Sequence, residues 1–150
     1  MVPTVEKLTR TDAGLASQLR VSVARLSRRL RNERDPDSTI SVSGLSVLGV
    51  LFREGESTVG RLAEHERVRP PSMTRTVSCL VEDGYVVRRP HDTDGRQTVL
   101  TLSEKGEETV RVERRRRDAW LAVRLRELSP EERDVLRRAA PILEALSQKG

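Results

Sequence analysis

Apolar residues in the N-terminal part of the chain recur at helical spacing. One stripe of a helix is formed by Leu15, Leu19, Val23, Leu26 and Leu30. The pattern begins near Asp12, and Pro36 is expected to end the helix because proline cannot continue its hydrogen bonding. A long helix with one apolar stripe requires a second surface on which to bury it. Residues 1–9 carry no strong pattern and are expected to form a mobile arm.

Three shorter helices are predicted between residues 39 and 84. Ser43 is a candidate N-cap for the first of them, and Gly55 suits its C-terminal end. Thr58 can cap the second, which is short. The third spans residues 70–84 and opens with two consecutive prolines, which the first turn tolerates because the N–H there has no helical partner.

The pattern changes from helical to β after residue 84. Residues 85–89 and 98–102 are rich in β-forming side chains. The polar segment between them contains proline, aspartate and glycine, which favour turns. These residues predict a β-hairpin with a protruding charged loop. Beyond it, serine caps at Ser103 and Ser129 predict two further helices that reach residue 147.

The predicted order of elements gives a mainly α fold with a small β-hairpin wing. Helices at 58–66 and 70–84, followed at once by a hairpin, form the layout of a winged helix-turn-helix, expected to span residues 39–102. In that layout helix 70–84 enters the major groove of double-stranded DNA, and the wing, residues 88–98, reaches the minor groove.

Helix 70–84 separates apolar from polar positions. Met73, Val77, Leu80 and Val81 group on the core side, and Arg75 lies almost opposite them. Taken alone, Arg75 is as readily a solvated charge as a DNA contact. The candidate DNA contacts on the polar face and on the wing are Ser72, Thr74, Arg75, Ser78, Arg88, Arg89, Asp94 and Arg96.

The wing tip carries an arginine suited to the minor groove. Arg96 matches the narrow, electronegative minor groove of A·T-rich DNA. Asp94 is expected to brace the Arg96 guanidinium by a bidentate pair and so to fix it before binding. Arg88 and Arg89 are weaker candidates for phosphate contacts.

Composition limits how DNA would be bound. Of the 150 residues, 25 are Arg and 3 are Lys, the net charge is +5, and apolar residues make up only 35%. Residues 41–102 carry as many acidic as basic side chains, so binding must rely on placed arginines rather than on bulk charge. The four arginines at 114–117 lie among acidic residues and are expected to form a solvated or ion-paired helix face.

Several other classes of protein are excluded or disfavoured. One Cys and two His cannot form a disulfide framework or an all-Cys/His zinc site. No apolar run approaches the roughly 18 residues of a membrane span. We therefore expect a cytoplasmic protein with no membrane partner, metal or cofactor. No phosphate loop or activated nucleophile suggests an enzyme.

Cys79 lies on the same side of helix 70–84 as Arg75. It is either a redox switch beside the DNA, because oxidation would add bulk or charge there, or an unreactive surface thiol. The unreactive thiol is favoured because no histidine or lysine neighbour is evident to activate it.

Five segments of the chain form one set of motifs: residues 57–64, 72–77 and 80–86, the wing at 88–96, and the segment 100–106. This set resembles the MarR family of bacterial transcription regulators, most specifically in the Asp-x-Arg of the wing and the Leu-Thr-x-x-Gly before the next helix. The turn at 65–69 reads His-Glu-Arg-Val-Arg, where the family commonly has an apolar residue and then Gly.

The resemblance implies an obligate homodimer with two winged modules on one palindromic operator. It also implies a repressor, released by oxidation or by a small-molecule effector held between the dimer helices and the winged module. The helices at 10–36 and 103–147 complete a single domain of residues 1–150. They support the dimer independently of the resemblance, because the winged module is too small to cover their apolar stripes. Trp120 is expected in the dimer core. A twofold dimer predicts inverted half-sites about 10 base pairs, or a multiple of one turn, apart.

A second class of function stays open from the sequence. In a winged-helix protein-interaction module, Arg75 and Arg96 would meet an acidic protein instead of DNA. That hypothesis predicts no bound duplex at physiological salt.

Overall fold

The chain is built from helices and one small sheet, as the sequence predicts. The computed structural model describes residues 10–149, and the arm expected at residues 1–9 lies outside them. In chain order the elements are α2 (Asp12–Asn32), α3 (Val42–Glu54), β1 (Ser57–Thr58), α4 (Val59–Glu66), α5 (Pro70–Glu82), β2 (Val86–Pro90), β3 (Thr98–Leu102), α6 (Glu104–Arg126) and α7 (Pro130–Ser147).

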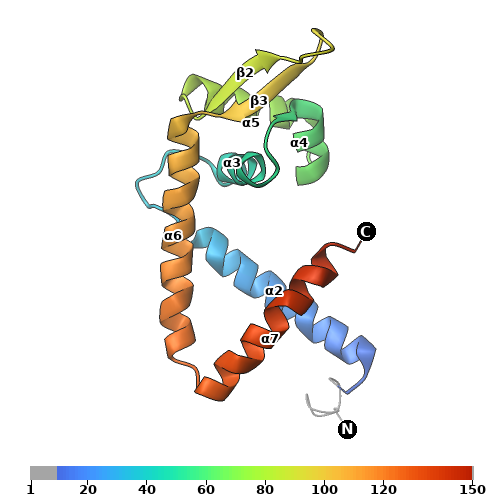
Figure 1. Cartoon of the computed structure of the whole chain (residues 1–150), viewed down its shortest axis with the longest axis vertical. Coiled ribbons are helices and arrows are strands. Elements are labelled where there is room, and N and C mark those ends of the chain that lie inside the picture. Colours follow the sequence, from blue (N-terminus) through green and yellow to red (C-terminus); the bar gives the residue numbers. More distant parts are fainter. Residues whose placement is uncertain (1–9, 150) are drawn as a thin grey trace.

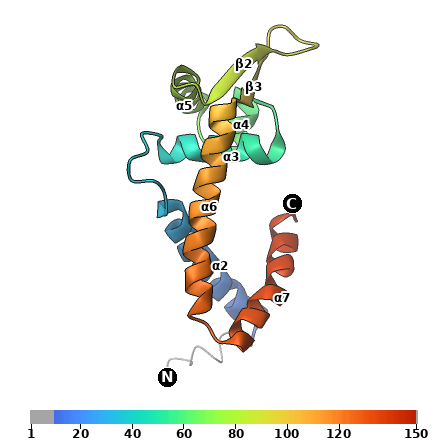
Figure 2. The same cartoon turned by 60° about the vertical axis from the view of Figure 1, so that its left-hand side comes forward.

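The elements form two regions that α6 connects. The winged module, α3 to β3, lies at one end, while α2, α7 and the C-terminal half of α6 lie at the other (Figure 1). The turned view shows α6 running without a break between the two regions (Figure 2). With 23 residues, α6 is roughly 35 Å long.

Hydroxyl side chains cap the helices, and one cap differs from the prediction. Thr58 and Ser103 accept hydrogen bonds from backbone N–H groups in the first turns of α4 and α6, as predicted. Ser129 forms a reciprocal capping box at the start of α7. The cap of α3 is Ser41 and not Ser43. Both serines lie near the start of the apolar pattern, and only Ser41 precedes the first helical residue.

The helix α2 also ends earlier than predicted, at Asn32, four residues before Pro36. Proline at 36 has no N–H to donate to the Asn32 carbonyl and disfavours helical backbone at Asp35, so its effect reaches back one turn. Beyond the helix, the backbone N–H of Asp35 donates a hydrogen bond to the carboxylate of Glu113 on α6, at 3.3 Å.

The sheet has three antiparallel strands in the order β1-β3-β2. The predicted hairpin is confirmed, with Val86 paired to Leu102 and Pro90 to Thr98. The two-residue strand β1 was not predicted, because two residues carry no periodic signal. Its pairing of Ser57 with Leu100 joins the wing to the helical part of the module.

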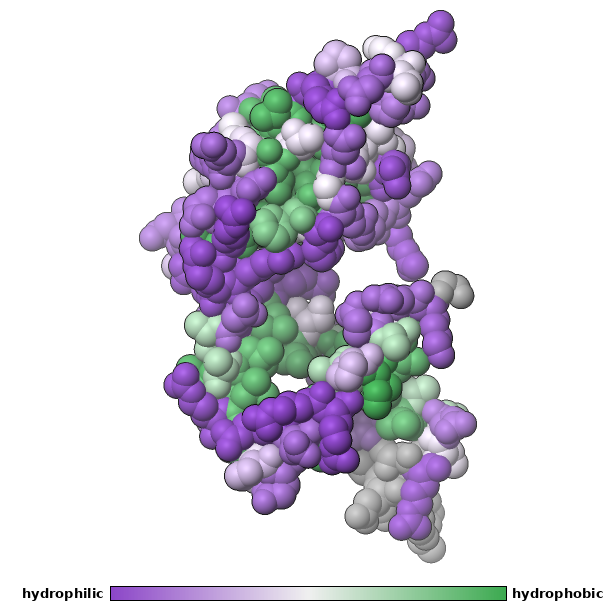
Figure 3. All heavy atoms as spheres, viewed as in Figure 1, coloured by the Kyte–Doolittle hydropathy of each residue, from purple (hydrophilic) through white to green (hydrophobic). Residues whose placement is uncertain are grey.

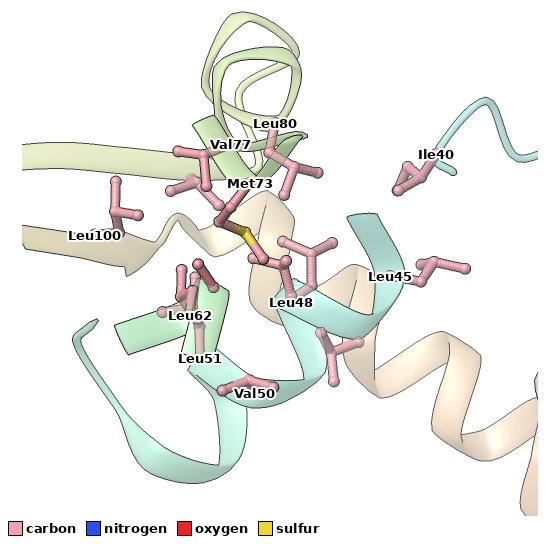
Figure 4. Packing of buried hydrophobic residues seen from close by; sticks show 14 residues of the cluster. Ile40, Leu45, Leu48, Val50, Leu51, Leu62, Met73, Val77, Leu80 and Leu100 are labelled. Atoms are coloured by element: carbon pink, nitrogen blue, oxygen red, sulfur yellow. The ribbon is translucent and has the colours of Figure 1, made fainter. Parts of the chain in front are cut away.

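The hydrophobic core lies inside the winged module. Leu48, Leu62, Val77 and Leu100, from four different elements, are completely or almost completely buried and pack together (Figure 4). Met73 and Leu80 join Val77 in this core, as the helical wheel predicts, whereas Val81 is half-buried at its edge. The core therefore holds α5 with its opposite face toward solvent.

The other region has no comparable core within one chain. Neither α2 nor α7 contains a buried residue among those described. Large apolar side chains on these helices are exposed, and Ile142 reaches 61%. Hydrophobic residues are visible on the surface of the lower half of the molecule as well as on the upper half (Figure 3). No helix in the described part of the chain is long and apolar enough to cross a membrane.

Candidate nucleic-acid interface

The exposed face of α5 presents small hydroxyl side chains and one arginine. Ser72, Thr74 and Arg75 are exposed, and Ser78 is half-buried. The Thr74 hydroxyl donates to the Pro70 carbonyl at 3.0 Å, within the first turn of the helix. Arg75 makes no hydrogen bond or ion pair with any described residue, so its charge is available to an anionic partner.

The wing is attached to α5 through Arg88. The guanidinium of Arg88 on β2 donates to the hydroxyl of Ser78 at 3.0 Å. Because Ser78 is neutral, this hydrogen bond positions Arg88 without compensating its charge. The structure thus brings two of the predicted contacts together, between the helix expected in the major groove and the strand that leads to the wing tip.

Arg89, the next residue, has acidic partners. Its guanidinium donates to Glu56, in the turn before β1, and to Asp92 at the start of the wing loop, the latter at 3.0 Å. The hydrogen bond to Glu56 raises the pKa of Arg89 above its ordinary value. The charge of Arg89 is therefore compensated within the protein.

The wing tip folds around two local hydrogen-bond acceptors. The Nδ1 atom of His91 accepts from the backbone N–H groups of Thr93 and Asp94, at 3.3 and 3.2 Å. A carboxylate oxygen of Asp94 accepts from the backbone N–H of Arg96 at 3.1 Å. Both contacts lie within three residues along the chain, so they order the tip locally.

The predicted bidentate pair between Asp94 and the Arg96 guanidinium is wrong. A short aspartate side chain reaches the backbone two residues later more readily than it reaches the end of a long arginine. Asp94 fixes the backbone of the turn, and the guanidinium of Arg96 makes no hydrogen bond or ion pair with any described residue. It extends from the tip as an uncompensated charge.

Three of the four arginines at 114–117 have partners within the protein, and the fourth, Arg117, has none among the described residues. Arg114 lies over the ring of Phe52, 4.4 Å from its centroid. Arg115 pairs with Glu108 at 3.0 Å, and Arg116 lies 3.9 Å from Asp35. These contacts agree with the predicted ion-paired face rather than with a nucleic-acid patch.

Comparison with known proteins identifies this architecture. A family model described as the MarR family matches residues 40–98. An HTH-type transcriptional regulator of Mycobacterium bovis is 52% identical over 136 residues, which are 91% of this chain and 94% of the relative. The chain belongs to the MarR family.

Solved structures of MarR-type proteins share the whole fold. A protein of Pseudomonas aeruginosa assigned as a transcriptional regulator has a TM-score of 0.82 at 33% identity, over 99% of both chains. A MarR family protein of Bacillus stearothermophilus has a TM-score of 0.76 at 28% identity, over 93% of this chain and 97% of that one. The chain is thus a transcriptional regulator of the helix-turn-helix type, and the relatives have a non-catalytic function.

The turn between α4 and α5 shows how this chain departs from the common MarR pattern. Glu66 takes the position of the usual apolar residue, and its carboxylate accepts the hydroxyl of Ser46 on α3. Arg67 takes the position of the usual glycine and adopts a left-handed conformation with φ 53°. The sequence showed the departure, but it did not indicate Ser46 as the partner.

An arginine-lined cavity lies where α2, α3 and α6 meet. Its volume is about 120 Å³, and its lining residues are Arg31, Val42, Leu45, Ser46, Gly49, Arg53 and Arg117. None of the three arginines forms an ion pair with a described residue, and the Nε atom of Arg117 is buried without a hydrogen-bond partner. The sequence could not place this cavity, because its arginines are more than 20 residues apart.

Cys79 is exposed on α5, on the Arg75 side, as the helical wheel predicts. It lines a shallow depression together with Arg75 and Leu80. Among the described residues, no group of three or more His, Cys, Asp or Glu side chains could hold a metal ion.

Proposed function

We propose that this MarR-family regulator binds a palindromic operator as a homodimer and represses transcription by occupying it. The observation that carries the proposal is that two exposed arginines, Arg75 on α5 and Arg96 on the wing that follows it, have no ion-pair partner among the described residues. An exposed helix and a flanking hairpin, each with a free guanidinium, suit adjacent grooves of one duplex.

The candidate contacts divide between the two grooves and the backbone. Helix residues 70–84 enter the major groove, where Ser72, Thr74, Arg75 and Ser78 meet base edges and nearby phosphates. Wing residues 88–98 reach the minor groove with the guanidinium of Arg96. The carboxylate of Asp94 fixes the backbone at Arg96 by accepting its N–H. Arg88 is placed for a phosphate contact.

The dimer follows from the apolar surface of α2, α6 and α7. Side chains that a single chain leaves exposed include Leu26, Val123, Leu136 and Ile142. Burying them against a second copy stabilises by about 25 cal/mol per Å² of apolar surface removed from water. A twofold interface of this kind relates the two winged modules by symmetry and so requires inverted half-sites.

The arginine-lined cavity supports a small anionic effector. Arg31, Arg53 and Arg117 bring three uncompensated charges to one space between the dimer helices and the winged module. A small carboxylate suits such a set, because guanidinium groups bind carboxylates through two parallel hydrogen bonds. Thermal unfolding with a series of monocarboxylates tests this role. Stabilisation of the wild type, lost in Arg117→Met, supports it, and an equal shift in both proteins contradicts it.

The deciding experiment for DNA binding is fluorescence anisotropy with DNA from upstream of the coding sequence, over a salt series with scrambled competitor. Saturable binding at two chains per site that resists the competitor supports an operator-specific dimer. The dependence on salt then gives the number of phosphate contacts. Binding that the competitor abolishes on every fragment tested would favour a protein-interaction module instead.

A further inference from the structure

The two-stranded wing carries an ion-pair network at its base. Arg89 sits on β2 opposite Val99 of β3. It binds Asp92 at the beginning of the wing loop and Glu56 in the turn that leads from α3 into β1. Glu56 and Arg89 are 33 residues apart in sequence, so the guanidinium joins the wing loop to the helical part of the module.

The position of Glu56 makes it a fixed partner. It follows Gly55, whose φ of 82° ends α3, and it precedes Ser57, which pairs with Leu100 in the sheet. The backbone on both sides of Glu56 is therefore set by the core. A hairpin of two strands is only marginally ordered by itself, and a tie to such a fixed point restricts its direction.

Electrostatics separates Arg89 from the other wing arginines. Arg88 has only a neutral hydroxyl partner, and the guanidinium of Arg96 has no partner among the described residues. Arg89 faces two carboxylates, so the cluster of these three side chains carries one net negative charge. A phosphate approaching Arg89 would have to displace one carboxylate and would be repelled by both.

We propose that Arg89 is a positioning residue, held by Glu56 and Asp92, which sets the direction of the wing and does not contact DNA. The inference rests on the proposed function, because wing direction matters only if Arg96 must reach a groove. Exposed ion pairs contribute little to stability. The role of the network is to order the wing before binding, which lowers the entropy lost on association.

The inference predicts an effect of unexpected sign for Glu56→Gln. Removing a negative charge near DNA should strengthen binding by simple electrostatics. If Glu56 positions the wing, Glu56→Gln should instead weaken binding, roughly three- to ten-fold. Glu108→Gln is the matched control, because it removes the same charge from an exposed ion pair on α6; it should leave the affinity unchanged or slightly higher.

Salt dependence distinguishes positioning from phosphate contact. The variants are compared by anisotropy on an upstream fragment that the wild type prefers. Arg89→Gln should weaken binding while leaving the salt slope unchanged, and the double variant with Glu56→Gln should be no weaker than Arg89→Gln alone. Arg89→Lys should also weaken binding, because a single ammonium replaces the fork that joins two carboxylates. A slope that falls by about 0.9 in Arg89→Gln, with full binding in Arg89→Lys, would show a phosphate contact and overturn the inference.

Hydrogen exchange tests the same inference without DNA. In Glu56→Gln, the amides of residues 91–97 should exchange faster, while those of α5 keep their protection. Unchanged exchange in the wing would overturn the inference, even if no fragment is bound specifically. If the wild type prefers no DNA fragment, that result counts against the proposed function and not against the role of Glu56. The exchange comparison still tests that role.

Discussion

The hydroxyl of Ser46 on α3 lies 2.9 and 2.8 Å from the two carboxylate oxygens of Glu66 at the end of α4. Glu66 is half-buried, at 23% side-chain exposure, in a position where MarR-family chains commonly have an apolar residue. The hydroxyl supplies the donor that a carboxylate needs when it is partly removed from water. A polar contact thus joins α3 and α4 at the place of an apolar one.

This contact predicts a specific pattern of stabilities. Ser46→Ala leaves the carboxylate without its hydroxyl donor, with the Nδ1 atom of His65 still 3.5 Å from one oxygen, and should lower the free energy of unfolding by about 1–2 kcal/mol. Adding Glu66→Leu should recover most of the loss, because no unsatisfied group then remains. Urea unfolding at a fixed protein concentration measures both changes. A double variant no more stable than Ser46→Ala would contradict the assignment.

Gly106, in the first turn of α6, explains the glycine of the family motif. A Cβ at this position would overlap the backbone carbonyl of Tyr85, which cannot move easily. Gly106→Ala should therefore destabilise the protein by at least about 2 kcal/mol, or prevent its folding. Gly60→Ala is the matched control, because a Cβ there meets open space on α4. The control should be neutral or stabilising by up to about 1 kcal/mol in thermal or urea unfolding.

Arg67 is the only described residue other than glycine with a positive φ. A left-handed conformation costs a residue with a side chain about 1 kcal/mol or more. Arg67→Gly should therefore stabilise the protein by roughly 0.5–1 kcal/mol, despite the greater freedom of glycine in the unfolded chain. Arg61→Gly removes the same charge from the regular helix α4 and should destabilise. If Arg67→Gly is as unstable as Arg61→Gly, the turn carries no strain.

Arg96→Ala tests recognition in the minor groove. The variant should weaken operator binding by about 1–3 kcal/mol, which is roughly five- to 150-fold, and the loss should be greatest on A·T-rich flanks, whose narrow groove attracts arginine. Anisotropy on operators with A·T-rich and G·C-rich flanks measures this difference. Arg115→Ala, on α6, serves as the control for loss of one charge. An equal loss on all flanks would count against recognition of groove shape.

Cys79 is expected to be an unreactive thiol, although it lies beside Arg75 on the proposed DNA face. The surface depression that Cys79 lines also contains Arg75 and Asp83, but no histidine or lysine. Peroxide-treated protein should bind the operator as tightly as reduced protein, and Cys79→Ser should be indistinguishable from the wild type. Loss of binding on oxidation that a thiol reductant reverses, and that Cys79→Ser abolishes, would show a redox switch.

Local signals in the sequence were sufficient for most of the fold. Helical spacing, the caps at Thr58, Ser103 and Ser129, and the change of period after Gly84 act within a few residues of one another. The winged module and the outward direction of Arg75 follow from these signals. So does the exposure of the flanking helices, because their apolar stripes are visible in the sequence and the winged module is too small to cover them.

Only the tertiary structure decided which side chains meet. Strand β1, the partnership of Arg89 with Glu56, the donor for Glu66 and the arginine-lined cavity all join segments that are distant in sequence. Asp94 shows that the partner of a side chain is hard to predict even at short range. Its carboxylate accepts the backbone N–H of Arg96 and does not pair with the Arg96 guanidinium. Periodicity fixes the direction of a side chain from its helix or strand. The partner it reaches depends on how distant segments pack, and spacing along the chain carries no information about that.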